Sequence, residues 1–230
     1  MGIEPALRRR LPRCLWAAVS AVLVTSCMTS RVEESKNAAT GLGPGESVVI
    51  LATSYHRGKA TEEDFVSCVN DAVQSGDGKV RVTPQQAFID ALFPWFEPRT
   101  APQSADALPE LLARPGVAER IEAQGVRYLV WLDGTTEKTS GGGSLSCAVG
   151  PGGGGCFGLT WWEDDASYDA AVWDLHRQSN AGSVSADVHG TSMIPALIIP
   201  VPLIARTQSA ACREMAQQLR QFIHGPEVGS

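Results

Sequence analysis

The chain has 230 residues, 43% of them hydrophobic, and a formal charge of −6 at neutral pH. This length and apolar fraction are sufficient for a domain with a real hydrophobic core. Binding to nucleic acid requires clustered Lys and Arg, so an acidic chain with no basic run beyond residue 13 is not expected to bind nucleic acid.

The first 27 residues have the layout of a bacterial export signal. Four arginines, at positions 8–10 and 13, precede ten uncharged and mostly apolar residues from Leu15 to Val24. A stop-transfer helix needs about 20 apolar residues, so the run is too short to anchor the chain and is typical of a signal peptide over residues 1–26. The residues Val24-Thr-Ser-Cys27 that follow resemble a lipobox. The resemblance implies cleavage before Cys27 and lipidation of Cys27. The alternative is an ordinary signal peptide, with Cys27 an incidental thiol.

Cleavage would leave 204 residues with 15 basic and 24 acidic side chains, a formal charge of −9. A chain this acidic would not be attracted to anionic lipid, so we expect its contact with the membrane to depend on the lipid anchor. Met28 at the second mature position is no acidic retention signal, which implies an outer-membrane lipoprotein that faces the periplasm. Residues 27–46 are mostly polar and are interpreted as a flexible tether.

Residues 47–225 are expected to form a single domain. The apolar run 47–52 predicts a buried strand, and the β-branched and aromatic run 126–132 predicts another. Helices are expected after Thr61, over 83–93, 108–112, 117–124 and 208–223, and further strands over 79–82, 157–162, 167–176 and 183–189. This order predicts an α/β fold, a single mixed sheet with helices packed on it.

Four cysteines remain after Cys27, and an even number in an oxidising periplasm predicts two disulfides. Their spacing matches no zinc motif, and three pairings are possible. Cys147 and Cys156 lie in residues 141–156, where eight glycines predict a loop too flexible to pack regularly.

Two short segments resemble a known family of envelope domains. Residues 125–134, Gly-Val-Arg-Tyr-Leu-Val-Trp-Leu-Asp-Gly, resemble a strand of the TolB amino-terminal domain and of the curli-secretion lipoproteins. Residues 171–174 and 182–184 resemble the next hairpin of that family, and penicillin-binding-protein activator lipoproteins are similar in shape. Arg127 replaces the usual Asp, and Ser179-Asn-Ala181 departs from the usual turn. The resemblance implies a non-enzymatic envelope protein that binds other proteins.

The same resemblance implies a disulfide pairing. In that topology the first and last helices are neighbours, so Cys68 is expected to pair with Cys212, and Cys147 with Cys156. The alternative is that Cys68 and Cys212 are free, buried, small apolar residues.

Catalytic, metal and cofactor motifs are not recognisable in the sequence. The segment 150–156 lacks the Gly-Lys-Ser/Thr of a phosphate-binding loop, and the acidic residues 163–165 are interpreted as a solvated turn rather than a cation site. We expect no catalytic residue, metal or cofactor. The alternative function is an envelope hydrolase that uses His56 with Asp133 or with the acidic turn.

The candidate partner surface is the aromatic and proline-rich loop after residue 94, with Trp95, Phe96, Pro98 and Arg99. The apolar segment 193–205, interrupted by three prolines, is a second candidate. The alternative is that both are core. We therefore expect a lipid-anchored adaptor or assembly factor that binds an unidentified envelope protein.

Overall fold

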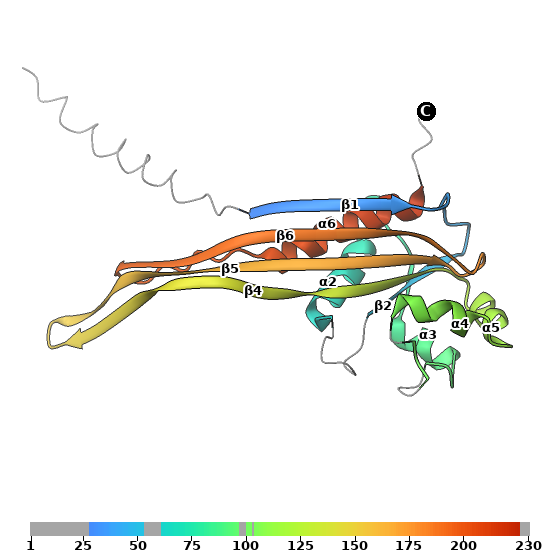
Figure 1. Cartoon of the computed structure of the whole chain (residues 1–230), viewed down its shortest axis with the longest axis horizontal. Helices are drawn as coiled ribbons and strands as arrows, with labels where there is room; N and C mark the ends of the chain where they lie inside the picture. The colour runs from blue at the N-terminus through green and yellow to red at the C-terminus, as the bar shows by residue number, and fades with distance from the viewer. Residues whose placement is uncertain (1–27, 53–60, 97–99, 103, 226–230) are drawn as a thin grey trace, which may run out of the picture.

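The computed structural model describes residues 28–52, 61–96, 100–102 and 104–225, which form one mixed sheet with helices packed against it (Figure 1). The strand order is β1-β6-β5-β4-β2-β3. The strands are β1 (Met28–Lys36), β2 (Ser47–Ala52), β3 (Val82–Thr83), β4 (Val126–Gly150), β5 (Gly153–Asp174) and β6 (Ser179–Ile198). The helices are α2 (Glu63–Val73), α3 (Gln85–Ala91), η3 (Ala105–Ala107), α4 (Leu108–Leu112), α5 (Val117–Ala123) and α6 (Thr207–His224). The predicted α/β class is confirmed.

The two apolar runs found in the sequence lie side by side in the sheet. Strand β2 pairs in parallel with the first part of β4, so that Val49 faces Leu129 and Leu51 faces Trp131. Residues 48–51 are all buried, because helices cover both faces of the sheet at this point. A continuous apolar run, rather than an alternating one, is the pattern that such a strand requires.

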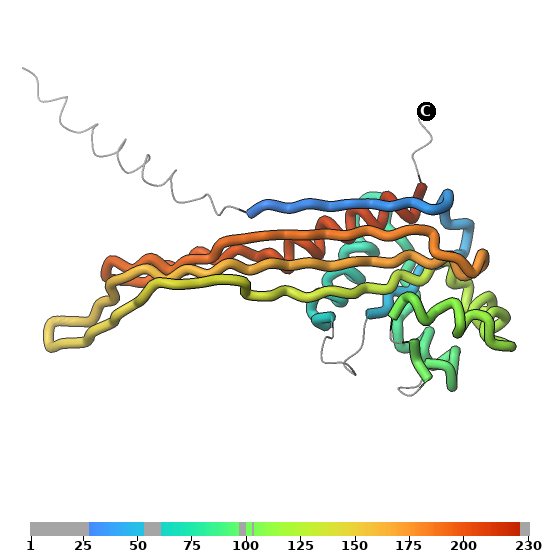
Figure 2. Tube along the Cα trace, viewed as in Figure 1, coloured from blue at the N-terminus to red at the C-terminus, as the bar shows by residue number. Residues whose placement is uncertain are grey.

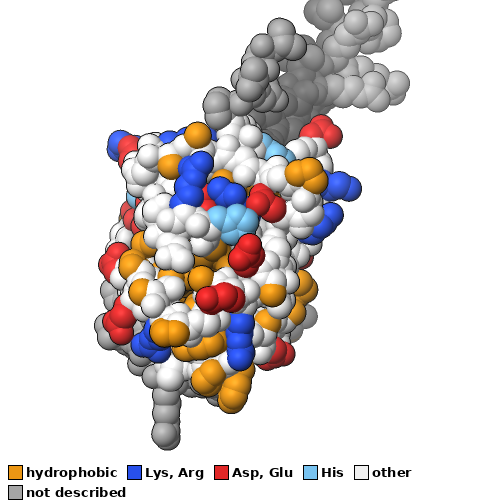
Figure 3. Space-filling model, turned by 90° about the vertical axis from the view of Figure 1, so that its right-hand side faces the viewer, with side chains coloured by type: hydrophobic (Ala, Val, Ile, Leu, Met, Phe, Trp, Pro, Cys, Tyr) orange, Lys and Arg blue, Asp and Glu red, His pale blue; other side chains and the backbone are white. Residues whose placement is uncertain are grey.

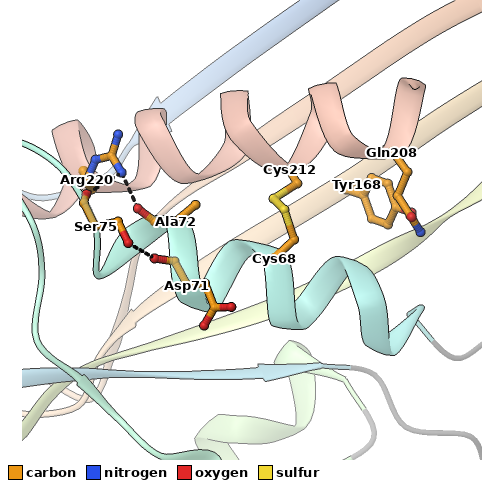
Figure 4. The surroundings of a disulfide bond; sticks show 8 residues. All are labelled: Cys68, Asp71, Ala72, Ser75, Tyr168, Gln208, Cys212 and Arg220. Carbon is orange, nitrogen blue, oxygen red and sulfur yellow. Dashed lines mark hydrogen bonds between the residues drawn. A yellow bond between two sulfur atoms is a disulfide. The ribbon is translucent and has the colours of Figure 1, made fainter. Parts of the chain in front are cut away.

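Helices α2 and α6 cover one face of the sheet. Phe65 and Val69 of α2, together with Met215 and Leu219 of α6, pack on the even-numbered side chains of β4, β5 and β6. The disulfide between Cys68 and Cys212 joins the two helices (Figure 4). This is the pairing that the family resemblance implied.

A second core lies on the opposite face and is confined to the β2–β4 end of the sheet. Apolar side chains from α3, α4 and α5 pack there against Val49, Leu129 and Trp131. These helices do not extend over the middle of β5 and β6, where the odd-numbered side chains Ser167, Asp169, Ser183, Ser185 and Asp187 are polar. Part of this sheet face is therefore uncovered.

The expectation of a flexible tether over residues 27–46 is wrong for its first half. Residues 28–36 form β1, which pairs antiparallel with β6 from Met28–Gly190 to Lys36–Gly182. The segment is polar because it is an edge strand with most of its side chains exposed, and exposed polar strands have the composition of a linker.

The expectation of an irregular loop over residues 141–156 is also wrong. Strands β4 and β5 pair as far as their turn, with one register shift between Lys138 and Ser140, and with β6 they project beyond the helices as a long three-stranded extension (Figure 2). Cys147 and Cys156 are direct cross-strand partners with Cα atoms 4.0 Å apart, and their disulfide holds this end in register. Glycine weakens strands locally, but backbone pairing on either side compensates for this. Among the described helices, none is long and apolar enough to cross a membrane.

Candidate functional site

An acidic patch lies on the uncovered face of the sheet. We call Asp133, Asp169 and Asp187 the acidic face. Asp133 of β4 is directly opposite Asp169 of β5, and Asp187 of β6 is opposite Ser167, two residues before Asp169. The odd-numbered positions of these strands point away from α2 and α6, so the three carboxylates share one side of the sheet. All three strands contribute to one surface.

The carboxylates of the acidic face influence one another. Partial burial, and then repulsion by Asp187 and Asp133, raise the pKa of Asp169. Like charges directly opposite each other on a sheet destabilise it. The arrangement therefore has a cost to stability that the fold itself does not require.

Several other charged groups on this face have polar partners. His189 Nδ1 lies 2.8 Å from Asp165 Oδ1, and Arg31 pairs with Glu33. Asp187 accepts a hydrogen bond from the Ser167 hydroxyl group at 2.6 Å, and Asp133 accepts one from the Gly134 amide at 2.9 Å. Within the described residues, the three aspartates of the acidic face form no ion pair, and no group of His, Cys, Asp or Glu side chains is arranged to hold a metal ion.

The projecting end of the sheet is a second surface and has the opposite character. Residues 139–162 and 190–205 contain no Asp, Glu, Lys, Arg or His. We call the exposed large apolar side chains at its far part the apolar tip, which consists of Val149, Phe157, Leu197, Ile198, Ile199 and Val201. Val149 is 91% exposed and Phe157 is 73% exposed. Figure 3 shows the other end of the molecule, where charged side chains of both signs are spread among apolar ones.

The two predicted partner surfaces differ in how far they are exposed. Phe96 is only 9% exposed and packs edge-on against Phe88 in the second core, and Trp95 is half-buried under the Arg120 guanidinium group. The expectation of a partner surface is therefore wrong for Phe96, which belongs to the core, whereas Trp95 is partly exposed and its place in a partner surface stays a prediction. Pro98 and Arg99 lie outside the described residues. The segment 193–205, by contrast, places Leu197, Ile198 and Ile199 on the surface.

The structure does not test the hydrolase alternative. His56 lies outside the described residues, as does Cys27. Residues 163–165 are not a turn, since they lie within β5, where Asp164 accepts hydrogen bonds from Trp162 and Ser192. No observation in the described part of the chain favours hydrolysis.

Asp169 and Asp187 were not predicted from the sequence to be members of a site. Their signal was the alternation of polar and apolar residues in 166–172 and 183–189, which placed the carboxylates on the face opposite the core. The alternation revealed two solvated strand faces, but only the pairing of the strands brought the carboxylates together.

No known protein family matches this chain, and no curated protein sequence matches it. Among solved structures, the PelC dodecamer from Paraburkholderia phytofirmans is similar with a TM-score of 0.39 and 12% identity, over 86% of this chain and 100% of that one. A PelC variant dodecamer from the same organism has a TM-score of 0.38 and 12% identity, over 86% and 99% of the two chains.

Proposed function

We propose that this protein is a lipid-anchored component of the cell envelope that binds another protein in the periplasm, as an adaptor or assembly factor. The observation that supports partner binding is the acidic face, three carboxylates from three strands on an uncovered face, which form no ion pair with any residue that the structure describes. The partner would present Lys or Arg at matching positions.

The charge pattern explains why such a surface would be kept. A partner that brings cations to Asp133, Asp169 and Asp187 relieves their mutual repulsion, so part of the cost to the free protein is recovered on binding. Complementary charge also accelerates encounter and excludes acidic partners. Because these carboxylates are exposed, the attraction should weaken as salt is added.

The proposed anchor is tested by the substitution Cys27→Ala in cells labelled with a fatty-acid analogue. The wild-type protein should carry the label and fractionate with membranes, and the variant should do neither. Equal labelling of the two proteins would contradict the lipid anchor.

The proposed partner surface is tested by crosslinking capture from envelopes. The triple variant Asp133→Asn, Asp169→Asn, Asp187→Asn should lose the captured partner without loss of thermal stability. A matched control neutralises three other exposed carboxylates, Asp77→Asn, Asp106→Asn and Glu119→Gln, and should capture normally. Equal loss in both triple variants would show that only net charge matters, and undiminished capture by the first would exclude the acidic face.

A further inference from the structure

We infer that the apolar tip contacts the lipid bilayer beside the protein's own lipid anchor. The first observation is chemical. Over the 24 residues 139–162, which include the β4–β5 turn, the chain has no ionisable side chain, although most of its side chains here are exposed. An exposed apolar surface of this kind marks a contact site, and the absence of charge favours hydrocarbon over a polar protein surface.

The second observation is where the chain enters the sheet. Met28 is the first residue of β1, is covalently next to Cys27, and pairs with Gly190 of β6, which in turn pairs with Asp164 of β5. The uncharged part of both strands begins at this level. An acyl chain on Cys27 would therefore bring the projecting end to the membrane, while the acidic face remains on the other side of this boundary. This orientation rests on the lipid anchor of the proposed function.

The third observation is the composition of the boundary. Trp161 and Trp162 are the last uncharged residues before Glu163, and the Trp162 ring lies 4.8 Å from the Lys138 ammonium group. The Trp162 indole N–H donates to Asp164 at 2.8 Å. Tryptophan with one apolar and one hydrogen-bonded side is the residue enriched where membranes meet water.

The edges of the sheet limit the depth of this contact. Residues 200–203 fold back along the outer edge of β6, where the Met193 and Leu203 amides donate to each other's carbonyl oxygens at 2.8 Å. No described strand pairs with the outer edge of β4 beyond Leu132, so over residues 139–150 the backbone amides and carbonyls on this edge have no strand partner. Such groups cost several kcal/mol each in hydrocarbon. The side chains of the apolar tip therefore enter the lipid, while the β4 backbone stays in the hydrated headgroup layer.

The length of the projection allows anchor and tip to touch the membrane together. From Gly190 to Ile198 the strand extends about 26 Å at about 3.3 Å per residue. With the anchor at one end of this stretch and the apolar tip at the other, the extension would lie obliquely along the bilayer. The apolar groove at the tip, lined by Ala148, Phe157, Leu197, Ile198 and the Cys147–Cys156 disulfide, would be filled by acyl chains.

The experiment uses the intact lipoprotein, extracted from membranes and returned to phosphatidylcholine vesicles. A fluorophore is attached at Val149→Cys or, as control, at Asp77→Cys in the turn after α2. Brominated acyl chains in the vesicles should quench the probe at position 149 and shift its emission to the blue, without effect at position 77. Adding Leu197→Asp and Ile199→Asp, both at exposed positions, should abolish the quenching at 149 while the melting temperature is unchanged.

Other outcomes overturn the inference. A probe at 149 that is quenched by aqueous iodide but not by brominated lipid would place the tip in water. A probe shielded from both quenchers would show that a second copy or another protein covers it. The mass of the protein reports acylation separately. An acylated protein with an unquenched probe refutes the tip contact alone, whereas a quenched probe on an unacylated protein keeps the tip contact and refutes the anchor.

Discussion

Cys68 in α2 and Cys212 in α6 are 144 residues apart in the chain, and their disulfide joins the first and last of the described helices with Cα atoms 6.2 Å apart. Figure 4 shows the same two helices linked again by Arg220, which donates to the carbonyl oxygens of Ala72 and Ser75. The helix layer over the first core is therefore closed by a covalent bond between distant parts of the sequence.

Removal of this disulfide should destabilise the protein more than removal of the other. In the chain-entropy model a loop of this length contributes about 5 kcal/mol, whereas the nine-residue loop between Cys147 and Cys156 contributes about 2.5 kcal/mol. Denaturant unfolding of Cys68→Ala/Cys212→Ala and of Cys147→Ala/Cys156→Ala measures the difference. Equal losses would argue that unfolded-chain entropy is not the main effect.

Replacing Asp169 with Asn should stabilise the fold and change its pH dependence. The pKa of Asp169 is raised in the folded state by burial, Asp187 and Asp133, so the folded protein holds this proton more tightly than the unfolded chain. That contribution is fully present below the unfolded pKa and is lost as pH rises through the folded pKa. At neutral pH we expect Asp169→Asn to gain a few tenths of a kcal/mol, since the site is solvent-screened. When pH is raised through the acidic range, the unfolding free energy should fall less steeply for the variant than for the wild-type protein. Asp77→Asn is the control.

Truncation of two phenylalanines should change stability by very different amounts. Phe96→Ala removes a buried ring from the second core and should cost about 3 kcal/mol or more. Phe157→Ala alters a ring that is 73% exposed on the apolar tip and should change stability by less than about 0.5 kcal/mol. Thermal melts of both variants decide this, and a large loss for Phe157→Ala would mean that the tip is covered by protein.

Gly134 should not tolerate a side chain. It has a φ of +130°, and a Cβ atom there would overlap the carbonyl oxygen of Ser167 on β5. Gly134→Ala should therefore cost more than about 1 kcal/mol. Gly152→Ala, in the open turn between β4 and β5, is the matched control because no atom lies within 4 Å of a Cβ at that position. If both variants unfold at the same denaturant concentration, the approach of the two strands at Gly134 is looser than described.

Local composition determined much of the fold. The β-branched run at 126–132 could only be a buried strand, and the regular apolar spacing in 208–223 required a helix on a core. An even number of cysteines in a chain expected to be exported predicted two disulfides, but their pairing came from a resemblance between topologies. The lipid anchor at Cys27 and the adaptor function remain predictions.

Tertiary structure alone decided which polar segments became strands and which side chains share a surface. Residues 28–36 and 141–156 look like linkers because polar and glycine-rich segments have weak strand preference, and they become strands only through pairing with β6 and with each other. Strand register, which the sequence does not specify across such distances, places Asp133 opposite Asp169 and brings Met28 level with the start of the uncharged extension. Whether an aromatic ring is core or surface likewise depends on which helices reach it, and so Phe96 is buried while Phe157 is exposed.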